Sequence, residues 1–192
     1  MSTHTTTLAD YRRKEGTNRL GLWLFIISDT FMFAGLFISR FYLLGTAIRP
    51  ELNQILGLVI TVVLLASSFF MNRAETAMRF GDRKGFLRGT LITLILGVIF
   101  LIGVVGVEWQ IAPFGPADGV AASLFYAMTG FHAFHVLTGV IFVFVVYRNG
   151  RKGLYSTERH WAVEACAVYW HFVDVVWVFF YPALYLIGIP GG

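Results

Sequence analysis

Charged side chains are scarce in this sequence. Only 14% of its 192 residues are charged and 57% are hydrophobic, a balance that excludes a disordered chain and most water-soluble folds. Cysteine is nearly missing, because Cys166 stands alone and can neither close an internal disulfide nor complete a CxxC motif. We interpret it as a small buried hydrophobic residue. Aromatic residues reach 17%, and the composition therefore indicates an integral membrane protein whose surface faces lipid.

The sequence also lacks a concentrated basic patch. The 15 Lys and Arg exceed the 11 Asp and Glu, for a net charge of +4, but they are spread among short connections, so we expect no nucleic-acid partner. Residues 1–19 lack the apolar core and the small-residue cleavage site of a secretory signal. We interpret residues 1–19 as a flexible cytoplasmic tail and residues 20–192 as a single transmembrane domain.

Long apolar runs make up most of residues 20–192. Each run reaches the length of about 20 residues that an α-helix needs to cross the hydrocarbon core of a bilayer, and the longer ones can tilt. The sequence therefore predicts an all-α fold, a polytopic bundle of five transmembrane helices. The predicted spans are residues 20–44, 52–71, 89–109, 120–147 and 161–188.

The distribution of Lys and Arg predicts the orientation of the bundle. Counted connection by connection, 13 of the 15 fall on the side of the N-terminal tail, and only Arg40 and Arg49 fall on the other side. Cytoplasmic loops carry an excess of Lys and Arg. The N-terminus is therefore expected in the cytoplasm and the C-terminus outside, in the periplasm.

Ionisable residues recur at similar depth on three of the predicted spans. An Asp at the centre of a span costs roughly 2.5–3.5 kcal/mol to insert, so Asp29 and Asp174 mark positions where structure or function requires them. His132 and His135 lie one helical turn apart on the fourth span. The fifth span carries four residues on one stripe, and we expect both stripes to face the protein interior. These four are Glu164, His171, Asp174 and Tyr181.

Two interpretations of this buried polar layer are compatible with the sequence. It is either a proton relay or metal site, or a set of hydrogen-bonded pairs that lock the helices together. An HxxH pair with a third His is compatible with zinc or iron, but the Glu-x-x-His pairs of di-iron bundles are absent, and no spacing identifies a haem. We expect no metal site and no catalytic residue in this chain. Glu108 and Glu164 lie near span ends, where water or lipid headgroups can solvate them.

Several segments carry a family resemblance that composition does not. The segment YWHFVDVVWVFFYPALY (residues 169–185) resembles the last transmembrane helix of subunit III of the haem-copper oxidases, and FYAMTGFHAFHVLTG (125–139) resembles the helix before it. GLWLFIISDTFMFAGLF (21–37) is similar to the family's helix with an intramembrane carboxylate. HWAVEACAVYW, GDRK and VEWQIAPF are similar to its connecting segments. The sequence is identified as a member of this cytochrome c oxidase subunit III family, in its five-helix bacterial form.

The resemblance implies a non-catalytic core subunit of a proton-translocating terminal oxidase, a complex that reduces dioxygen to water in aerobic respiratory electron transport. It implies no redox centre in this chain, with haem and copper held by partner subunits. The implied partners are the catalytic subunit I, subunit II, small additional subunits and phospholipids. The chain is expected to stabilise subunit I, bind lipid and support proton uptake. Five helices are typical of bacterial members, so the expected location is a prokaryotic plasma membrane.

The family's buried groups can be placed on this sequence residue by residue. The intramembrane carboxylate falls on Asp29, where the family usually has Glu. The second span ends in Met71, Asn72 and Arg73, where many relatives carry a His pair. The buried polar layer falls on His132, His135, Glu164, His171 and Asp174.

Other functions are compatible with the same residues. The related five-helix partner of nitric oxide reductase shares the subunit III pattern, and a small proton-coupled transporter or a generic membrane scaffold also fits a buried Asp and His layer. Against a transporter, the five runs show no matching halves and no paired broken helices around a midplane site. The electron donor of an oxidase complex is equally compatible with cytochrome c or quinol.

Overall fold

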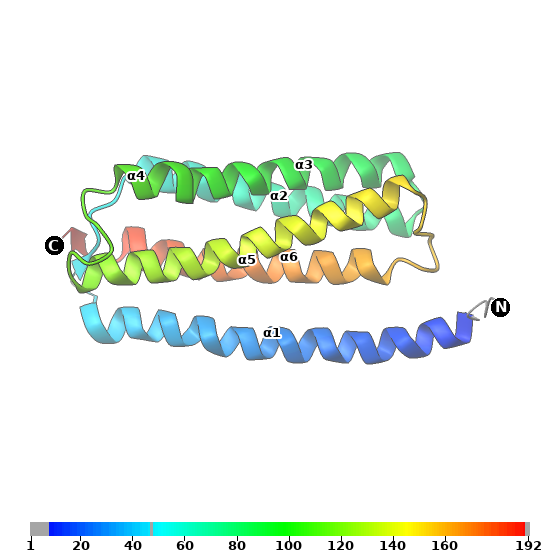
Figure 1. Cartoon of the computed structure of the whole chain (residues 1–192), viewed down its shortest axis with the longest axis horizontal. Coiled ribbons are helices and arrows are strands. Elements are labelled where there is room, and N and C mark those ends of the chain that lie inside the picture. The colour runs from blue at the N-terminus through cyan, green and yellow to red at the C-terminus, as the bar shows by residue number, and fades with distance from the viewer. Residues whose placement is uncertain (1–7, 47, 191–192) are drawn as a thin grey trace.

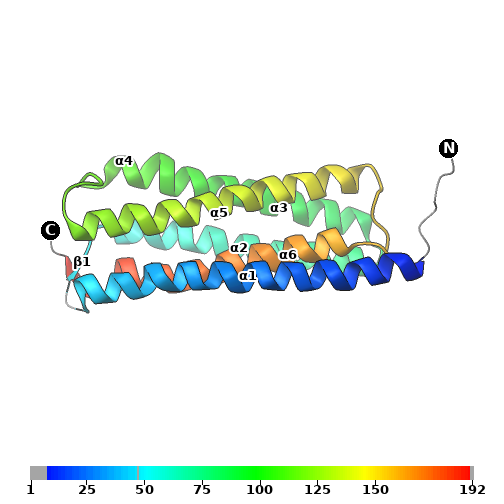
Figure 2. The same ribbon diagram turned by 60° about the horizontal axis from the view of Figure 1, so that its bottom comes forward.

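Five long helices run side by side in the computed structural model, which describes residues 8–46 and 48–190 (Figure 1). They are α1 (Leu8–Leu44), α2 (Gln54–Arg79), α3 (Arg83–Leu101), α5 (Val120–Arg151) and α6 (Trp161–Tyr181). Two π-helical turns extend them: η1 (Ile102–Glu108) joins α3 to the short α4 (Trp109–Ile111), and η2 (Pro182–Leu186) follows α6. The two-residue strands β1 (Ile48–Arg49) and β2 (Ile189–Pro190) pair in parallel at the end of the bundle where the C-terminus lies (Figure 2).

The number of predicted spans is confirmed. Within the described ranges, five helices are long and apolar enough to cross a membrane. Several helices extend beyond the predicted spans: α2 continues to Arg79, α3 begins at Arg83, and α5 continues to Arg151. Capping explains the early start of α3, because the Asp82 carboxylate accepts a hydrogen bond of 2.9 Å from the backbone N–H of Gly85. Hydropathy locates the part of a helix that lies in lipid, whereas caps and turns set where the helix begins and ends.

The helix α1 already begins at Leu8, so residues 8–19, which we interpreted from the sequence as part of a tail, are helical. This part of α1 is not isolated. The backbone N–H of Trp161, at the start of α6, donates a hydrogen bond of 3.0 Å to the Tyr11 hydroxyl. A contact with another helix therefore stabilises the polar first turns of α1. Residues 1–7 lie outside the described residues.

The helix α6 lies in the middle of the bundle and α1 along its edge (Figures 1 and 2). α6 packs against α1, α2 and α5, and the largest contacts of α1 are those with α5 and α6. Small residues allow the close approach of α3: a Cβ atom on Gly97 would lie 2.6 Å from the Trp170 ring, and one on Gly89 would lie 2.9 Å from the Ala74 side chain. The glycines of α3 therefore serve helix packing at these two positions.

Two buried tryptophans fix α6 to α2. Trp170 Nε1–H donates to Ser67 Oγ at 3.0 Å, and Trp177 Nε1–H donates to Thr61 Oγ1 at 2.9 Å. A buried indole N–H needs an acceptor, so each bond restrains the rotation of α6 about its own axis. This restraint decides which side chains α6 presents to α2.

Candidate functional site

The helix α1 buries only a narrow stripe against α5 and α6. The buried residues among its described side chains are Ile26, Asp29, Phe33 and Arg40, which follow one another at helical spacings of three, four and seven. Two of the four carry a charge in their usual ionisation state. Polar contacts, and not apolar packing alone, therefore hold α1 in place and set the position of Asp29.

Asp29 pairs with His135 of α5. The distance from Asp29 Oδ2 to His135 Nε2 is 3.1 Å, and the two residues are 7% and 6% exposed. Phe33 and Phe131 flank the imidazole, with ring centroids 4.9 Å and 4.7 Å from that of His135. The pair is therefore shielded from water by aromatic side chains.

Asp29 Oδ2 and His135 Nε2 face each other at 3.1 Å without a hydrogen bond of standard geometry. The Nδ1 atom of His135 lies 2.8 Å from the carbonyl oxygen of Phe131, which can only accept, so Nδ1 carries a hydrogen. Nε2 is therefore the ring nitrogen that faces the Asp29 carboxyl group.

His132 does not join this pair, although it is only one helical turn from His135. It is fully buried, and neither of its ring nitrogens has a hydrogen-bond partner among the described residues. Its ring lies 4.9 Å from the Trp177 ring and 5.7 Å from the Phe100 ring, measured between centroids. The HxxH segment therefore places its two histidines in separate surroundings rather than on a common ligand.

His171 and Asp174 face α2. His171 Nδ1 lies 2.6 Å from the hydroxyl oxygen of Ser68. Asp174 is 4% exposed, and neither of its carboxylate oxygens has a hydrogen bond of standard geometry with the described residues. The expectation that the fifth span turns its polar stripe inward holds at Asp174, whereas His171 and Glu164 are only partly buried.

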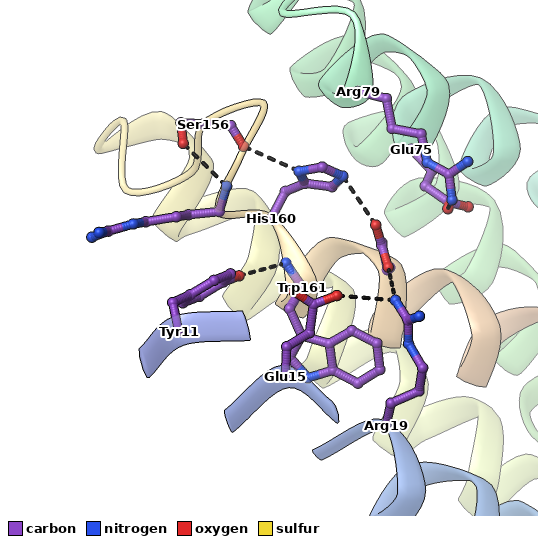
Figure 3. A network of polar contacts seen from close by, with 10 residues as sticks. Tyr11, Glu15, Arg19, Glu75, Arg79, Ser156, His160 and Trp161 are labelled. Atoms are coloured by element: carbon purple, nitrogen blue, oxygen red, sulfur yellow. Dashed lines mark hydrogen bonds and ion pairs between the residues drawn. The ribbon is translucent and has the colours of Figure 1, made fainter. Parts of the chain in front are cut away.

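Glu164, in the first turn of α6, contacts Arg19 and His160, which Figure 3 shows close to Glu15 and Trp161. One carboxylate oxygen is 3.1 Å from Arg19 of α1, and the other is 3.1 Å from His160 Nε2. The Arg19 guanidinium also lies 5.2 Å from the centroid of the Trp161 ring and contacts Glu15 at 3.0 Å. This cluster joins the first turns of α1 to the first turn of α6.

The predicted layer is therefore divided into separate groups. Asp29 and His135 form one pair, His171 and Asp174 face α2, His132 is enclosed by aromatic rings, and Glu164 belongs to the surface cluster. Among the described residues, no three His, Cys, Asp or Glu side chains come together as a metal site would require.

Sequence reasoning missed Arg40 as a buried group and counted its charge with the connection after the first span. It is fully buried in α1, where Nε donates to the carbonyl oxygen of Ala183 at 2.9 Å. Its two terminal nitrogens donate to the carbonyl oxygens of Gly45 at 2.8 Å and Ile187 at 3.0 Å. Arg40 thus joins the end of α1 to η2. The available signal was its spacing from Asp29 and Phe33, which puts all three on one helical face.

Glu108 was expected to be solvated at a span end, and that expectation is wrong. The residue is 1% exposed because η1 turns it into the bundle, where the Tyr185 side chain of η2 lies beside it. A π-helical turn changes the angular position of the residues that follow it. Counting along an ideal α-helix therefore gave the wrong surroundings for this residue.

These features define a multi-pass membrane protein whose buried acids and histidines lie in separate surroundings, without a metal-ligand cluster in the described part of the chain. The family model for cytochrome c oxidase subunit III matches residues 3–189, so the chain belongs to that family.

Curated relatives agree with this assignment. Cytochrome c oxidase subunit 3 of Thermostichus vulcanus is 34% identical over 174 residues, covering 88% of this chain and 86% of that protein. The proteins of the same description from Synechocystis sp. and Equus caballus are 36% identical over 176 residues and 39% identical over 180. Each match covers 87% of this chain, with 74% of the Synechocystis protein and 68% of the Equus protein.

Family membership confirms the predicted function. The chain is a non-catalytic subunit of the respiratory oxidase, it belongs to the complex with subunits I and II, and its family has no redox centre. The hypotheses of a nitric oxide reductase partner, a proton-coupled transporter and a generic scaffold are therefore set aside. The relatives include cyanobacterial and mitochondrial proteins.

Proposed function

We propose that this chain stabilises the catalytic subunit I and supports its proton uptake through the pair formed by Asp29 and His135. The observation that carries the proposal is the contact of 3.1 Å between these two buried side chains. The pair holds one proton in either of two positions, in surroundings where an unpaired charge costs several kcal/mol. It lies on α1, the helix at the edge of the bundle, so the proton is stored close to a surface that a partner subunit can cover.

The outer side of α1 favours burial against other apolar surfaces. Phe31 is 74% exposed and Ile38 is 64% exposed, although both belong to a membrane-spanning helix. Such side chains are covered either by lipid tails or by the helices of a partner subunit. Together with the buried contacts of Arg40, they make α1 a firm edge against which subunit I can pack.

The experiment compares the oxidase complex containing Asp29→Asn with wild type and with Asp29→Glu. We expect Asp29→Asn to assemble, because asparagine is similar in shape and stays polar, but to lose proton-uptake rate during turnover. Asp29→Glu restores an acid and should recover most of that rate. The control is Glu158→Gln, an exposed acid in the loop before α6.

Two results count against the proposal. Loss of the whole complex in Asp29→Asn would show that the carboxyl group is needed for folding or assembly. An assembled Asp29→Asn complex with unchanged proton uptake and unchanged durability in turnover would show that the pair carries no proton traffic. Blue native electrophoresis, oxygen consumption and pH-indicator kinetics separate these outcomes.

A groove between α2 and α3 supports the proposal that the chain binds phospholipid. It has a volume of about 580 Å³, and its charged lining residues are the three basic residues Arg73, Lys84 and Arg88 and one acid, Asp82. Phe70 and Ile92 line its apolar part. Each Lys or Arg near an anionic surface contributes about 1 kcal/mol of attraction, so three of them favour a negatively charged headgroup. Charge removal at Lys84 and Arg88 should lower the copurifying anionic phospholipid, whereas removal at the distant Lys14 should not.

We also propose the orientation with the N-terminus in the cytoplasm of a prokaryotic plasma membrane. Support comes from the ends of the bundle: the α2–α3 turn and the α5–α6 connection, both rich in basic residues, lie at the same end as the start of α1 (Figure 1). The variants Glu158→Cys and Asp118→Cys test this orientation through labelling with a membrane-impermeant thiol reagent. The native Cys166 is buried and should react slowly. If an impermeant reagent added outside the cell labels the cysteine at position 158, the opposite orientation is correct.

A further inference from the structure

A second buried acid lies on α6, apart from the pair formed by Asp29 and His135. Asp174 is 4% exposed, and the Ser68 hydroxyl of α2 lies beside its carboxyl group without a hydrogen bond of standard geometry. The same hydroxyl is 2.6 Å from Nδ1 of His171. Ser68 therefore stands between an imidazole and a carboxyl group, and a hydroxyl can donate to only one of them at a time.

Beyond His171, another polar side chain lies on α2 closer to the end of the bundle. Glu75 follows Ser68 on the same face of α2 and acts electrostatically on the His171 imidazole. Its side chain is 18% exposed and forms an ion pair of 2.7 Å with Arg79 (Figure 3). His171 itself is partly exposed, whereas Asp174 is buried. Asp174 is therefore the buried member of these four residues, whereas Glu75, His171 and Ser68 are each partly exposed.

The geometry points to a proton-exchange path along the interface of α2 and α6, in which His171 and Ser68 connect surface water near Glu75 to a proton-binding site at Asp174. In the forward step, His171 Nε2 takes a proton from water and Nδ1 releases one to Ser68 Oγ. Ser68 passes its own hydroxyl proton to an oxygen of the Asp174 carboxylate. One proton moves inward, and no electron or other atom is transferred.

The path is separate from the proposed function at Asp29. The other titratable groups near this level on the helices that pack against α6 are Asp29 on α1 and His132 and His135 on α5. Asp29 and His135 contact each other, and His132 is enclosed by aromatic rings. The contacts of Ser68 described above come from α6 alone. The path can thus fail while the pair at Asp29 still works.

The experiment measures hydrogen–deuterium exchange of the Asp174 carboxyl group in the purified oxidase complex by attenuated-total-reflection infrared spectroscopy. The carboxylic-acid C=O band that Asp174→Asn removes identifies the group. On changing from H₂O to D₂O, we expect this band to shift promptly in wild type and in Ser68→Thr, which keeps the hydroxyl. In Ser68→Ala, and equally in His171→Phe, the shift should slow by roughly tenfold or more, because a positioned proton carrier has been lost.

The control is Ser39→Ala on α1, a partly exposed serine whose hydroxyl donates to the carbonyl oxygen of Gly35 in its own helix. In this variant, the Asp174 carboxyl group should exchange at the wild-type rate. Equal exchange rates in wild type, Ser68→Ala and His171→Phe would refute the proposed path. So would the absence, at every pH at which the complex stays intact, of a C=O band that Asp174→Asn removes. If Ser68→Ala does not assemble, His171→Gln tests the path with the same expectation.

Discussion

Arg40 offers the sharpest test of how α1 is held. Its guanidinium reaches three backbone carbonyl groups, on Ala183, Gly45 and Ile187, at 2.8–3.0 Å, and no part of the residue is exposed. Arg40→Met keeps most of the apolar stem and removes all three donors. The carbonyl groups then lose their charged partner in a place that water reaches poorly.

The expected loss follows from these contacts. A buried acceptor left without its donor costs about 1 kcal/mol or more, so three of them cost about 3 kcal/mol in the free energy of unfolding. Three charge-assisted hydrogen bonds would by themselves be worth several kcal/mol. Burying the arginine charge has a desolvation cost, however, and Arg40→Met removes that cost as well. The net loss therefore stays at about 3 kcal/mol. The stability of Arg40→Lys should lie between those of wild type and Arg40→Met, because one ammonium group cannot match the planar fork of the guanidinium.

The assay is unfolding of the purified chain by a denaturing detergent, followed by the tryptophan signal, with thermal dissociation of the whole complex as a second measurement. Arg79→Met is the control, because Arg79 is an exposed arginine whose ion pair with Glu75 is worth no more than about 1 kcal/mol. If Arg40→Met and Arg79→Met lower stability equally, the buried contacts of Arg40 do not anchor α1 and the reasoning is refuted.

Further variants test the contacts of α3, α2 and α1. Gly97→Val should destabilise the bundle by about 2 kcal/mol in the same detergent titration, because its side chain would overlap the Trp170 ring; wild-type stability would contradict the tight approach. Thr61→Val should lower stability by about 1–3 kcal/mol by removing the acceptor of the Trp177 indole, while Thr61→Ser should keep most of it. Arg19→Ala should cost less than about 1 kcal/mol, and only at low salt, since its side chain is half exposed; a loss that persists in high salt would argue against this estimate.

The division of the polar layer explains where sequence reasoning stopped. Asp29 and Asp174 could be singled out because each interrupts an apolar run, and helical spacing correctly predicted that Asp174 faces the interior. The same reasoning counted Arg40 with the connection after its span and expected Glu108 to be solvated, since both lie near the ends of apolar runs. Their burial depends on η1, η2 and the end of α1 meeting in space, which no local pattern contains.

Hydropathy is a property of short stretches of chain, so the sequence alone determined the number of spans, their helical character and the family resemblance. The choice of partner for each buried group was decided only by the tertiary structure. Ser68 and His171 are 103 positions apart, and Arg40 and Ala183 are 143 apart. Helical spacing tells which face of a helix a residue occupies but not which neighbour covers that face, because the neighbour depends on how the helices rotate and cross when they pack.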